Sequence, residues 1–378
     1  MNKKSYDTII IGAGISGLSC ARRLSSNNSD FLIISKDIGG RLTTSEDGSA
    51  NYGAFFVCSD YKNFLEYCTL KNRIRLRDFC FHEKGKKYVL FQTKLIPYIF
   101  QFIKIYILLF KFRKRLRKLR IVSEKKSQKK AIKEDKFLYL LYNKSAEDFV
   151  KDKGLMKGTN VYLSKALFST TFSEISEMNA FSYLQFLIPL VTPVYRFKFD
   201  FDSLSSSFKD KIIIDIVKNI KYNGNQYEII LENKSFFCKN LVLATEITWS
   251  KKYTDIKEVN KKTSTNMLHI KGFYKDNFKN KRYHLFSPGS EVQAIADLED
   301  GTYLFYYKEK RPNLNKYFEN SKILHHRLWD PAGTINGHNL IECIRKNNLY
   351  IIGDCNIAGL EEAYITGLYC ANMILSSP

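Results

Sequence analysis

The hydrophobic pattern at the start of the chain predicts a parallel βαβ unit. Residues 6–11 form an apolar, β-branched run that ends in glycine, which indicates a buried strand. Residues 15–26 carry apolar side chains at helical spacing, and residues 31–34 form a second apolar run. A strand, a glycine turn, a helix and a strand within about thirty residues are typical of a βαβ unit.

Apolar runs of strand length return in the second half of the chain. Strands are predicted at residues 211–217, 227–231, 240–244 and 349–354, followed by a helix at residues 360–375. Residues 267–307 alternate apolar and polar positions and carry many aromatic residues, which predicts an antiparallel sheet. This order indicates a parallel-sheet domain that is interrupted by inserted segments.

Residues 95–110 are strongly apolar, and a block of Lys and Arg follows directly. We expect one or two helices over residues 95–120 in an inserted domain. Such a segment can lie on an anionic membrane surface, or it can be a cap helix with a solvated basic face. Pro97, Gln101 and Lys104 interrupt the run, so it is a poor membrane-spanning helix.

The turn after the first predicted strand carries a glycine motif with the sequence Gly12-Ala13-Gly14-Ile15-Ser16-Gly17. In this pattern the first glycine makes a tight turn and the second lets the backbone approach a pyrophosphate. The third lets the helix pack on the strand. The helix N-terminus also offers free N–H groups and a positive dipole end to phosphate. The motif therefore predicts a dinucleotide site.

The end of the second predicted strand departs from the usual dinucleotide pattern. An acidic residue that binds the adenosine ribose is expected near position 35, but the chain has Ser35-Lys36-Asp37. Ser35 or Asp37 could hydrogen-bond the ribose. Lys36 could instead meet a 2′-phosphate, which would favour NADP over FAD.

Two further motifs follow, Gly39-Gly40-Arg41-Leu42-Thr43-Thr44 and then Asn51-Tyr52-Gly53-Ala54-Phe55-Phe56. They resemble the second glycine motif and the following turn of the amine oxidase superfamily of flavoproteins. The resemblance implies FAD, with Arg41 over the pyrophosphate and Gly53-Ala54 near the flavin ring. The residue types agree with this, because paired glycines permit close backbone approach and a guanidinium suits phosphate.

The resemblance returns at the C-terminus, where Gly353-Asp354 is similar to a strand end of the superfamily and residues 359–367 to its following helix start. It implies that Asp354 contacts the ribityl or phosphate region and that the helix N-terminus faces the flavin. Besides the first glycine motif, the expected cofactor contacts are Ser35, Lys36, Gly40, Arg41, Leu42, Thr43, Tyr52, Gly53, Ala54, Phe55, Val217, Ala244, Gly353, Asp354, Leu360, Glu361 and Ala363. No cysteine resembles the residue that links flavin covalently in some members, so we expect non-covalent FAD.

These patterns together predict an α/β fold, in which an α+β substrate (cap) domain is inserted into a Rossmann-type FAD-binding domain. The FAD-binding domain is expected at residues 1–60, 205–250 and 335–378. The cap is expected at 61–204 and 251–334, including a basic helical segment over 95–130. The inserted regions carry no family motif, so catalytic residues stay unassigned, with candidates by residue type at Lys271, Lys308 and Tyr307.

The resemblance implies an FAD-dependent oxidoreductase that transfers hydride from a C–N or C–C centre of a small organic substrate to flavin N5. The cofactor carries this chemistry, and the protein positions the substrate. One alternative is a desaturase, isomerase or prenyl-type oxidase that acts on a lipophilic substrate at a membrane surface. Another is a flavin-bound binding protein without catalysis.

The net positive charge of the chain bears on which partners it can bind. The 378 residues include 60 Lys and Arg against 38 Asp and Glu, a formal net charge of +22. Such a field attracts phosphates and anionic membranes, although the excess can also reflect composition alone. No nucleic-acid module is recognisable, so nucleic-acid binding is not expected.

The cysteines and histidines give no sign of a disulfide framework or a metal site. The eight cysteines form no CxxC pair, which is typical of reduced, buried thiols in a chain of this length. The six histidines show no metal-ligand spacing with them, so no metal is expected. No signal peptide is recognisable, and the expected location is cytoplasmic, with peripheral membrane contact through residues 95–130 as the alternative.

Overall fold

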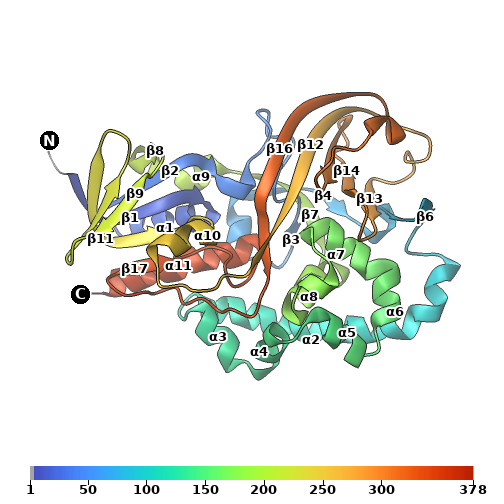
Figure 1. The fold of residues 1–378 in the computed structure, drawn as a ribbon, viewed down its shortest axis with the longest axis horizontal. Coiled ribbons are helices and arrows are strands. Elements are labelled where there is room, and N and C mark those ends of the chain that lie inside the picture. The colour runs from blue at the N-terminus through green and yellow to red at the C-terminus, as the bar shows by residue number, and fades with distance from the viewer. Residues whose placement is uncertain (1–3, 378) are drawn as a thin grey trace.

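The computed structural model describes residues 4–377, and its dinucleotide-type part is built on a mainly parallel sheet (Figure 1). Strand β1 lies between β2 and β11, parallel to both, and β11 also pairs in parallel with β17. The hairpin β9–β10 joins the sheet through β11, and β8 forms the opposite edge beside β2. The strands are β1 (Lys4–Gly14), β2 (Phe31–Gly39), β8 (Ile212–Ile214), β9 (Asn219–Tyr222), β10 (Tyr227–Ile230), β11 (Ser235–Leu243) and β17 (Leu349–Ile351).

The inner segments of the central strands are apolar because both faces of this sheet are covered. Ile10 and Ile33 pack on one side with helices α1 (Ile15–Ser25) and α11 (Leu360–Ser376). Ile9 and Ile11 pack on the other side with the hairpin. Helices α1 and α11 lie close together, since a Cβ at Gly367 would come within 2.0 Å of the Ser19 hydroxyl. The short helices α9 (Phe201–Ser205) and α10 (Ile247–Ser250) complete this part.

The second part, the cap, contains a seven-stranded sheet of order β16-β12-β15-β14-β13-β5-β6 and a three-stranded sheet of order β3-β7-β4. The long strands β12 and β16 run from the dinucleotide part into the cap (Figure 1). The strands of the cap are β3 (Val57–Cys58), β4 (Cys68–Ile74), β5 (Phe79–Glu83), β6 (Lys86–Tyr88), β7 (Val194–Phe199), β12 (Lys261–Tyr274), β13 (Tyr283–Phe286), β14 (Val292–Asp297), β15 (Thr302–Tyr307) and β16 (Phe318–Asn336).

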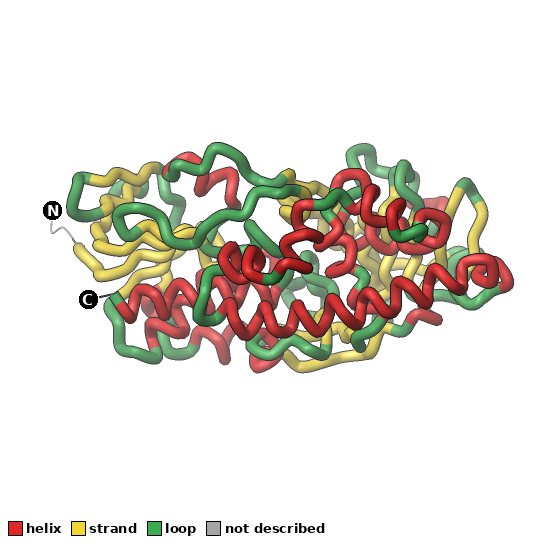
Figure 2. The backbone as a smooth tube through the Cα atoms, turned by 90° about the horizontal axis from the view of Figure 1, so that it is seen from below, coloured by secondary structure: helices red, strands yellow, loops and turns green. Residues whose placement is uncertain are grey.

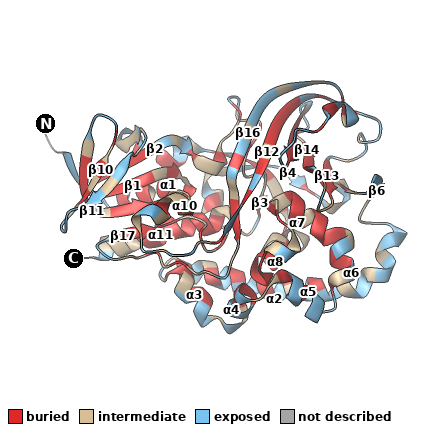
Figure 3. Cartoon of the chain, viewed as in Figure 1, coloured by how far each residue is buried: buried red, intermediate tan, exposed pale blue. Residues whose placement is uncertain are grey.

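A layer of helices closes the cap on one side, and Figure 2 shows the longest of them running along the underside of the molecule. The helices are α2 (Ile99–Ser123), α3 (Gln128–Glu134), α4 (Lys136–Asn143), α5 (Ala146–Asp152), α6 (Met156–Gly158), α7 (Ser164–Thr171) and α8 (Ala180–Phe186). Helix α2 buries a stripe at helical spacing that includes Ile105, Leu109 and Phe112. Figure 3 shows α8 buried beneath this layer, whereas the outer helices alternate between buried and exposed positions.

The structure confirms the predicted βαβ unit, the antiparallel sheet within residues 267–307 and helix over residues 95–120, where one or two helices were expected and α2 follows a short 3-10 turn at Thr93–Tyr98. The strand predicted at residues 211–217 is shorter, since β8 ends at Ile214. One further backbone hydrogen bond follows the strand, from the Asp215 N–H to the Ser35 carbonyl oxygen. The chain then leaves the sheet edge. The pattern did not reveal β16, because its exposed middle carries consecutive polar residues and its pairing partner, β12, lies far away in the sequence.

Candidate cofactor and substrate site

A continuous cavity of about 1330 Å³ runs from the glycine turn after β1 into the cap. Most of the residues predicted to contact a cofactor line it. They are Gly12, Ala13, Gly14, Ile15, Ser16, Ser35, Lys36, Gly40, Arg41, Leu42, Gly53, Ala54, Phe55, Val217, Ala244, Gly353, Asp354, Leu360 and Ala363. Segments that are far apart in the sequence therefore meet along one wall of one cavity.

The glycine turn leaves room for a ligand at one position and closes tightly at another. Gly12 has a φ of +107°, and a Cβ there would lie 2.6 Å from the Ala244 carbonyl oxygen. A Cβ at Gly14 would meet nothing within 4 Å, because this residue faces open space. Helix α1 begins directly after Gly14 and has no side-chain cap, so its first N–H groups are available to an anion. This arrangement fits a pyrophosphate.

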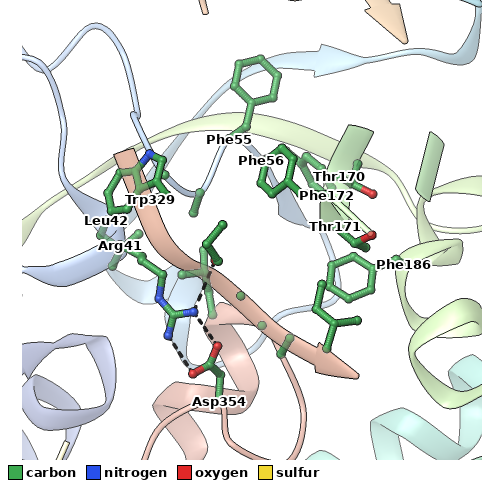
Figure 4. A pocket seen from close by; sticks show the side chains of 18 of the residues that line it. Arg41, Leu42, Phe55, Phe56, Thr170, Thr171, Phe172, Phe186, Trp329 and Asp354 are labelled. Carbon is green, nitrogen blue, oxygen red and sulfur yellow. Dashed lines mark hydrogen bonds and ion pairs between the residues drawn. The ribbon is translucent and has the colours of Figure 1, made fainter. Parts of the chain in front are cut away.

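The second glycine motif and the C-terminal strand end are joined by an ion pair. The Arg41 guanidinium donates to both carboxylate oxygens of Asp354, at 2.6 and 2.7 Å (Figure 4). The Asp354 carboxylate raises the pKa of Arg41. A Cβ at Gly53 would lie 2.1 Å from the Arg41 carbonyl oxygen, so glycine is needed where the next turn crosses this loop. The three motifs thus form one rigid wall.

The N-terminus of α11 supplies a second anion-binding end to the cavity. Leu360 and Ala363 line it, and the helix has no side-chain cap. Glu361 does not reach the cavity, although it was expected to. Its carboxylate accepts backbone N–H groups of Lys62, Asn63 and Phe64 at 2.9–3.0 Å. Glu361 therefore ties the helix to the start of the cap.

Three other expected contacts support the cavity from behind. A Cβ at Gly17 would lie 2.0 Å from the Gly12 carbonyl oxygen, so this glycine serves helix packing. The Thr43 hydroxyl donates to the Gly40 carbonyl at 2.7 Å. The ring of Tyr52 stacks on His325 with centroids 4.7 Å apart. None of the three is among the lining residues.

The strand end that departs from the usual acidic pattern uses Ser35 internally. Its hydroxyl donates to the Asp37 carbonyl at 2.6 Å and accepts the Ala13 N–H at 3.1 Å. The Ser35 hydroxyl is therefore committed to the junction of β1 and β2. Lys36 and Asp37 line the cavity, so both remain available to the adenosine end of a ligand.

The cap half of the cavity is mainly apolar. Figure 4 shows Phe55, Phe56, Phe172 and Phe186 around it. Its acidic lining in the cap is confined to Asp330, which is paired with Lys262 at 3.0 Å. Other charged lining residues of the cap are arginines, namely Arg73, Arg75, Arg77 and Arg327. The chamber therefore offers no free carboxylate to an ammonium group among the residues that line it.

Three buried hydroxyl groups of the cap lack a hydrogen-bond partner within the protein and belong to lining residues. They are those of Tyr162, Thr192 and Tyr306. Buried polar groups are normally hydrogen-bonded, so these unpaired hydroxyls are unusual, and their oxygen atoms expose almost no surface to the cavity. Burial raises the pKa of Tyr306, which keeps its hydroxyl protonated as a donor. No sequence motif marks these residues, although Tyr306 lies in the aromatic run of β15.

The residues considered as catalytic candidates do not line the cavity. Lys271 is exposed on β12, and the exposed Lys308 has its ammonium 4.9 Å from the ring centroid of Phe168. The Tyr307 hydroxyl lies 3.3 Å from His326 Nε2, on the other side of the sheet from the neighbouring Tyr306. Nothing in this geometry brings the three residues to a substrate.

Comparisons with known proteins agree with this geometry. The family model described as an NAD(P)-binding Rossmann-like domain matches residues 10–69. No curated protein sequence matches the chain. A structure of putrescine oxidase bound to putrescine has a TM-score of 0.70 at 11% identity and covers 99% of this chain and 100% of that one. The chain thus carries a Rossmann-like dinucleotide domain within a larger fold that is similar to that of putrescine oxidase.

Two further structures show how widely this fold is used. Cyclohexylamine oxidase from Brevibacterium oxydans IH-35A has a TM-score of 0.63 at 12% identity, with 97% of both chains covered. A CLA-producing fatty acid isomerase from P. acnes has a TM-score of 0.67 at 13% identity, with 98% of both chains covered. The predicted α/β fold class is confirmed, and the resemblance to amine oxidases extends from the motifs to the whole fold.

Proposed function

We propose that the protein is an FAD-dependent oxidoreductase that acts on an uncharged, lipophilic substrate taken up at an anionic membrane surface. One observation carries this proposal. The cavity joins the glycine turn to an apolar chamber, and its wall continues to the exposed residues Phe91, which precedes helix α2, and Tyr106, which lies on it. A substrate could thus pass from the surface to the dinucleotide site without crossing water.

The dinucleotide wall fits FAD. The open space at Gly14 and the uncapped start of α1 suit a pyrophosphate, and Arg41 lies between this turn and the start of α11. The positive end of α11 would stabilise negative charge on a reduced flavin ring. Bound FAD would accept a hydride from the substrate, and the chain itself would orient the substrate and exclude water. The similarity of the paired glycine motifs to those of amine oxidases favours FAD over NADP.

The cap chamber favours a C–C centre over a charged amine. An ammonium group would lose its hydration there without gaining a partner carboxylate, which is strongly unfavourable. Aromatic walls instead suit an apolar chain or ring. Desaturation of a lipid-like molecule, in which the substrate loses two hydrogens, is the reaction type that these features support best.

Helix α2 supports the membrane part of the proposal. We define the apolar patch as the exposed side chains of Phe91, Ile96, Ile99, Phe100, Ile103, Tyr106, Ile107 and Phe110. Phe100 is 78% exposed, and Ile107 is 64% exposed. Large exposed apolar side chains that lie together mark an interaction site.

The second half of α2 adds a positive surface to the apolar patch. Lys111, Lys114, Arg115 and Lys118 are exposed there. Within residues 4–377, Thr93–Ser123 is the one helix that is long and apolar enough to cross a membrane, by length and composition alone. Its buried stripe packs on the cap, so we infer that α2 lies flat on a membrane, with its apolar patch inserted and its basic half near anionic headgroups.

The cofactor and the reaction are tested together. The purified protein is expected to show a flavin spectrum and to release FAD on denaturation. Under anaerobic conditions, polyenes or unsaturated lipids should bleach the flavin, whereas diamines and monoamines should not. Bleaching by amines alone would overturn the lipophilic assignment, and a protein that neither contains nor takes up FAD would overturn the oxidoreductase.

Membrane contact is tested by co-sedimentation with vesicles of phosphatidylcholine, with and without phosphatidylserine. Binding is expected to need phosphatidylserine and to weaken with salt. The double variant Phe100→Ser/Ile107→Ser should lose most of this binding. Leu140→Ser is the matched control, since Leu140 is 58% exposed on α4, outside the apolar patch. Equal binding by the double variant and the control would contradict the role of α2.

A further inference from the structure

Three side chains that are common metal ligands meet on the face of the cap sheet that points away from the cavity. Cys80 and His82 are two residues apart on β5, so both point to the same face. His284 on the adjacent parallel strand β13 is the register neighbour of Cys80. The intervening residues of β5, Phe79 and Phe81, line the cavity instead. The alternation of the two strands thus separates the cysteine and histidines from the cavity.

The ligand atoms are already close together. One ligand atom from each of Cys80, His82 and His284 lies within 4.8 Å of the other two. His82 Nε2 is 2.9 Å from His284 Nδ1. If both nitrogens bonded a tetrahedral ion at about 2.0 Å, they would need to move only slightly further apart.

The tautomer of His284 suits a metal ligand. Its Nε2 lies 3.2 Å from the carbonyl oxygens of both Phe278 and Lys281, so Nε2 carries the hydrogen. Nδ1 is then left with a lone pair directed toward His82. An N–H to backbone carbonyl bond of this kind typically orients metal-binding histidines.

An aromatic shell surrounds the cluster. The ring of His82 stacks between Phe278 and Phe286, with centroids 5.3 and 4.6 Å away. The imidazole of His82 is therefore held in place between two aromatic rings.

We propose that Cys80, His82 and His284 bind a Zn²⁺ ion that connects strands β5 and β13. The Cys80 thiol gives up its proton to solvent as the sulfur–zinc bond forms, and the proton of His82 moves from Nε2 to Nδ1, so that both histidines bind as neutral ligands. Water occupies the remaining tetrahedral position. The ion links segments that are 202 residues apart, from His82 to His284, and so fixes one wall of the cap. This site goes beyond the proposed oxidoreductase function and does not depend on it.

The test measures zinc and FAD in the same sample of full-length protein, after incubation with Zn²⁺ and removal of the loosely bound ion. About one zinc per chain is expected in the wild type. Cys80→Ser and His284→Gln should each lower the retained zinc at least tenfold. Cys238→Ser is the matched control, because Cys238 is equally buried but lies in the dinucleotide sheet.

X-ray absorption at the zinc edge of the wild-type protein covers the case in which a variant fails to fold. One sulfur at about 2.3 Å and two histidine nitrogens at about 2.0 Å are expected. A wild-type protein that retains no zinc, or whose zinc has no sulfur ligand, would overturn the site. So would folded Cys80→Ser and His284→Gln variants that keep their zinc. A protein with FAD but without zinc would refute this inference alone.

Discussion

Replacing Gly14 by valine separates cofactor binding from folding. A Cβ at this position meets nothing within 4 Å. The backbone of Gly14 has φ −76° and ψ 177°, a region open to every L-residue. The variant therefore adds a side chain to the space reserved for the pyrophosphate without straining the turn.

The two free-energy effects differ in size. Valine is a poorer N-cap than glycine, at a cost of about 1 kcal/mol, and the reduced freedom of the unfolded chain offsets roughly 0.4–1 kcal/mol of that. Displacing the phosphates removes charge-assisted hydrogen bonds that contribute about 1.5–3 kcal/mol each. Losing two of them, roughly 3–6 kcal/mol, should weaken FAD binding by about 10²- to 10⁴-fold.

The assay compares FAD titration with urea unfolding of the cofactor-free proteins. Gly14→Val should lose FAD affinity yet unfold within about 1 kcal/mol of the wild type. Gly17→Ala should instead lower the free energy of unfolding, because its Cβ would lie 2.0 Å from the Gly12 carbonyl oxygen. Wild-type FAD affinity in Gly14→Val would refute the assignment of the turn.

Two further variants test the polar groups on either side of the cavity. Arg120→Met leaves the buried Glu362 carboxylate without its partner at 2.7 Å and should cost about 3–5 kcal/mol of unfolding free energy at pH 7. Burial raises the pKa of Glu362, although Arg120 opposes this shift. Glu362 therefore takes up its proton as pH falls, and the loss of unfolding free energy in Arg120→Met should shrink toward pH 5. Equal losses by urea unfolding at pH 7 and pH 5 would contradict this. Tyr306→Phe removes a buried hydroxyl that has no partner among the described residues, so it should leave the free energy of unfolding unchanged or raise it by about 1 kcal/mol at unchanged FAD content, and a loss of stability in urea would contradict this.

The dinucleotide wall was predictable because its signals are local. A strand, a glycine turn and a helix lie within consecutive residues, and each glycine reports a backbone geometry that its neighbours impose. The positions of Gly12, Gly14 and Gly17 therefore followed from the sequence. The motif resemblance also indicated that Arg41 and Asp354 belong to one site, although not that they form an ion pair.

The roles of side chains outside the motifs depended on long-range pairing. Glu361 stands inside a motif, but its carboxylate binds backbone N–H groups of residues 62–64 because the cap chain passes over the start of α11. Tyr306 and Tyr307 are neighbours on β15, yet only Tyr306 is among the residues that line the cavity. Residue type could not distinguish them, since the backbone pairing of β15 decides which face each meets.

The sequence by itself determined the βαβ unit, the dinucleotide turn and the apolar run with its following basic block after residue 95, because composition, periodicity and glycine placement act over a few residues. Only the tertiary structure decided what encloses the cavity and that Cys80 and His82 meet His284. Those contacts arise when strands far apart in the chain pair in one register, and the free energy that selects this register comes from burying whole sheet faces. No local pattern contains that information.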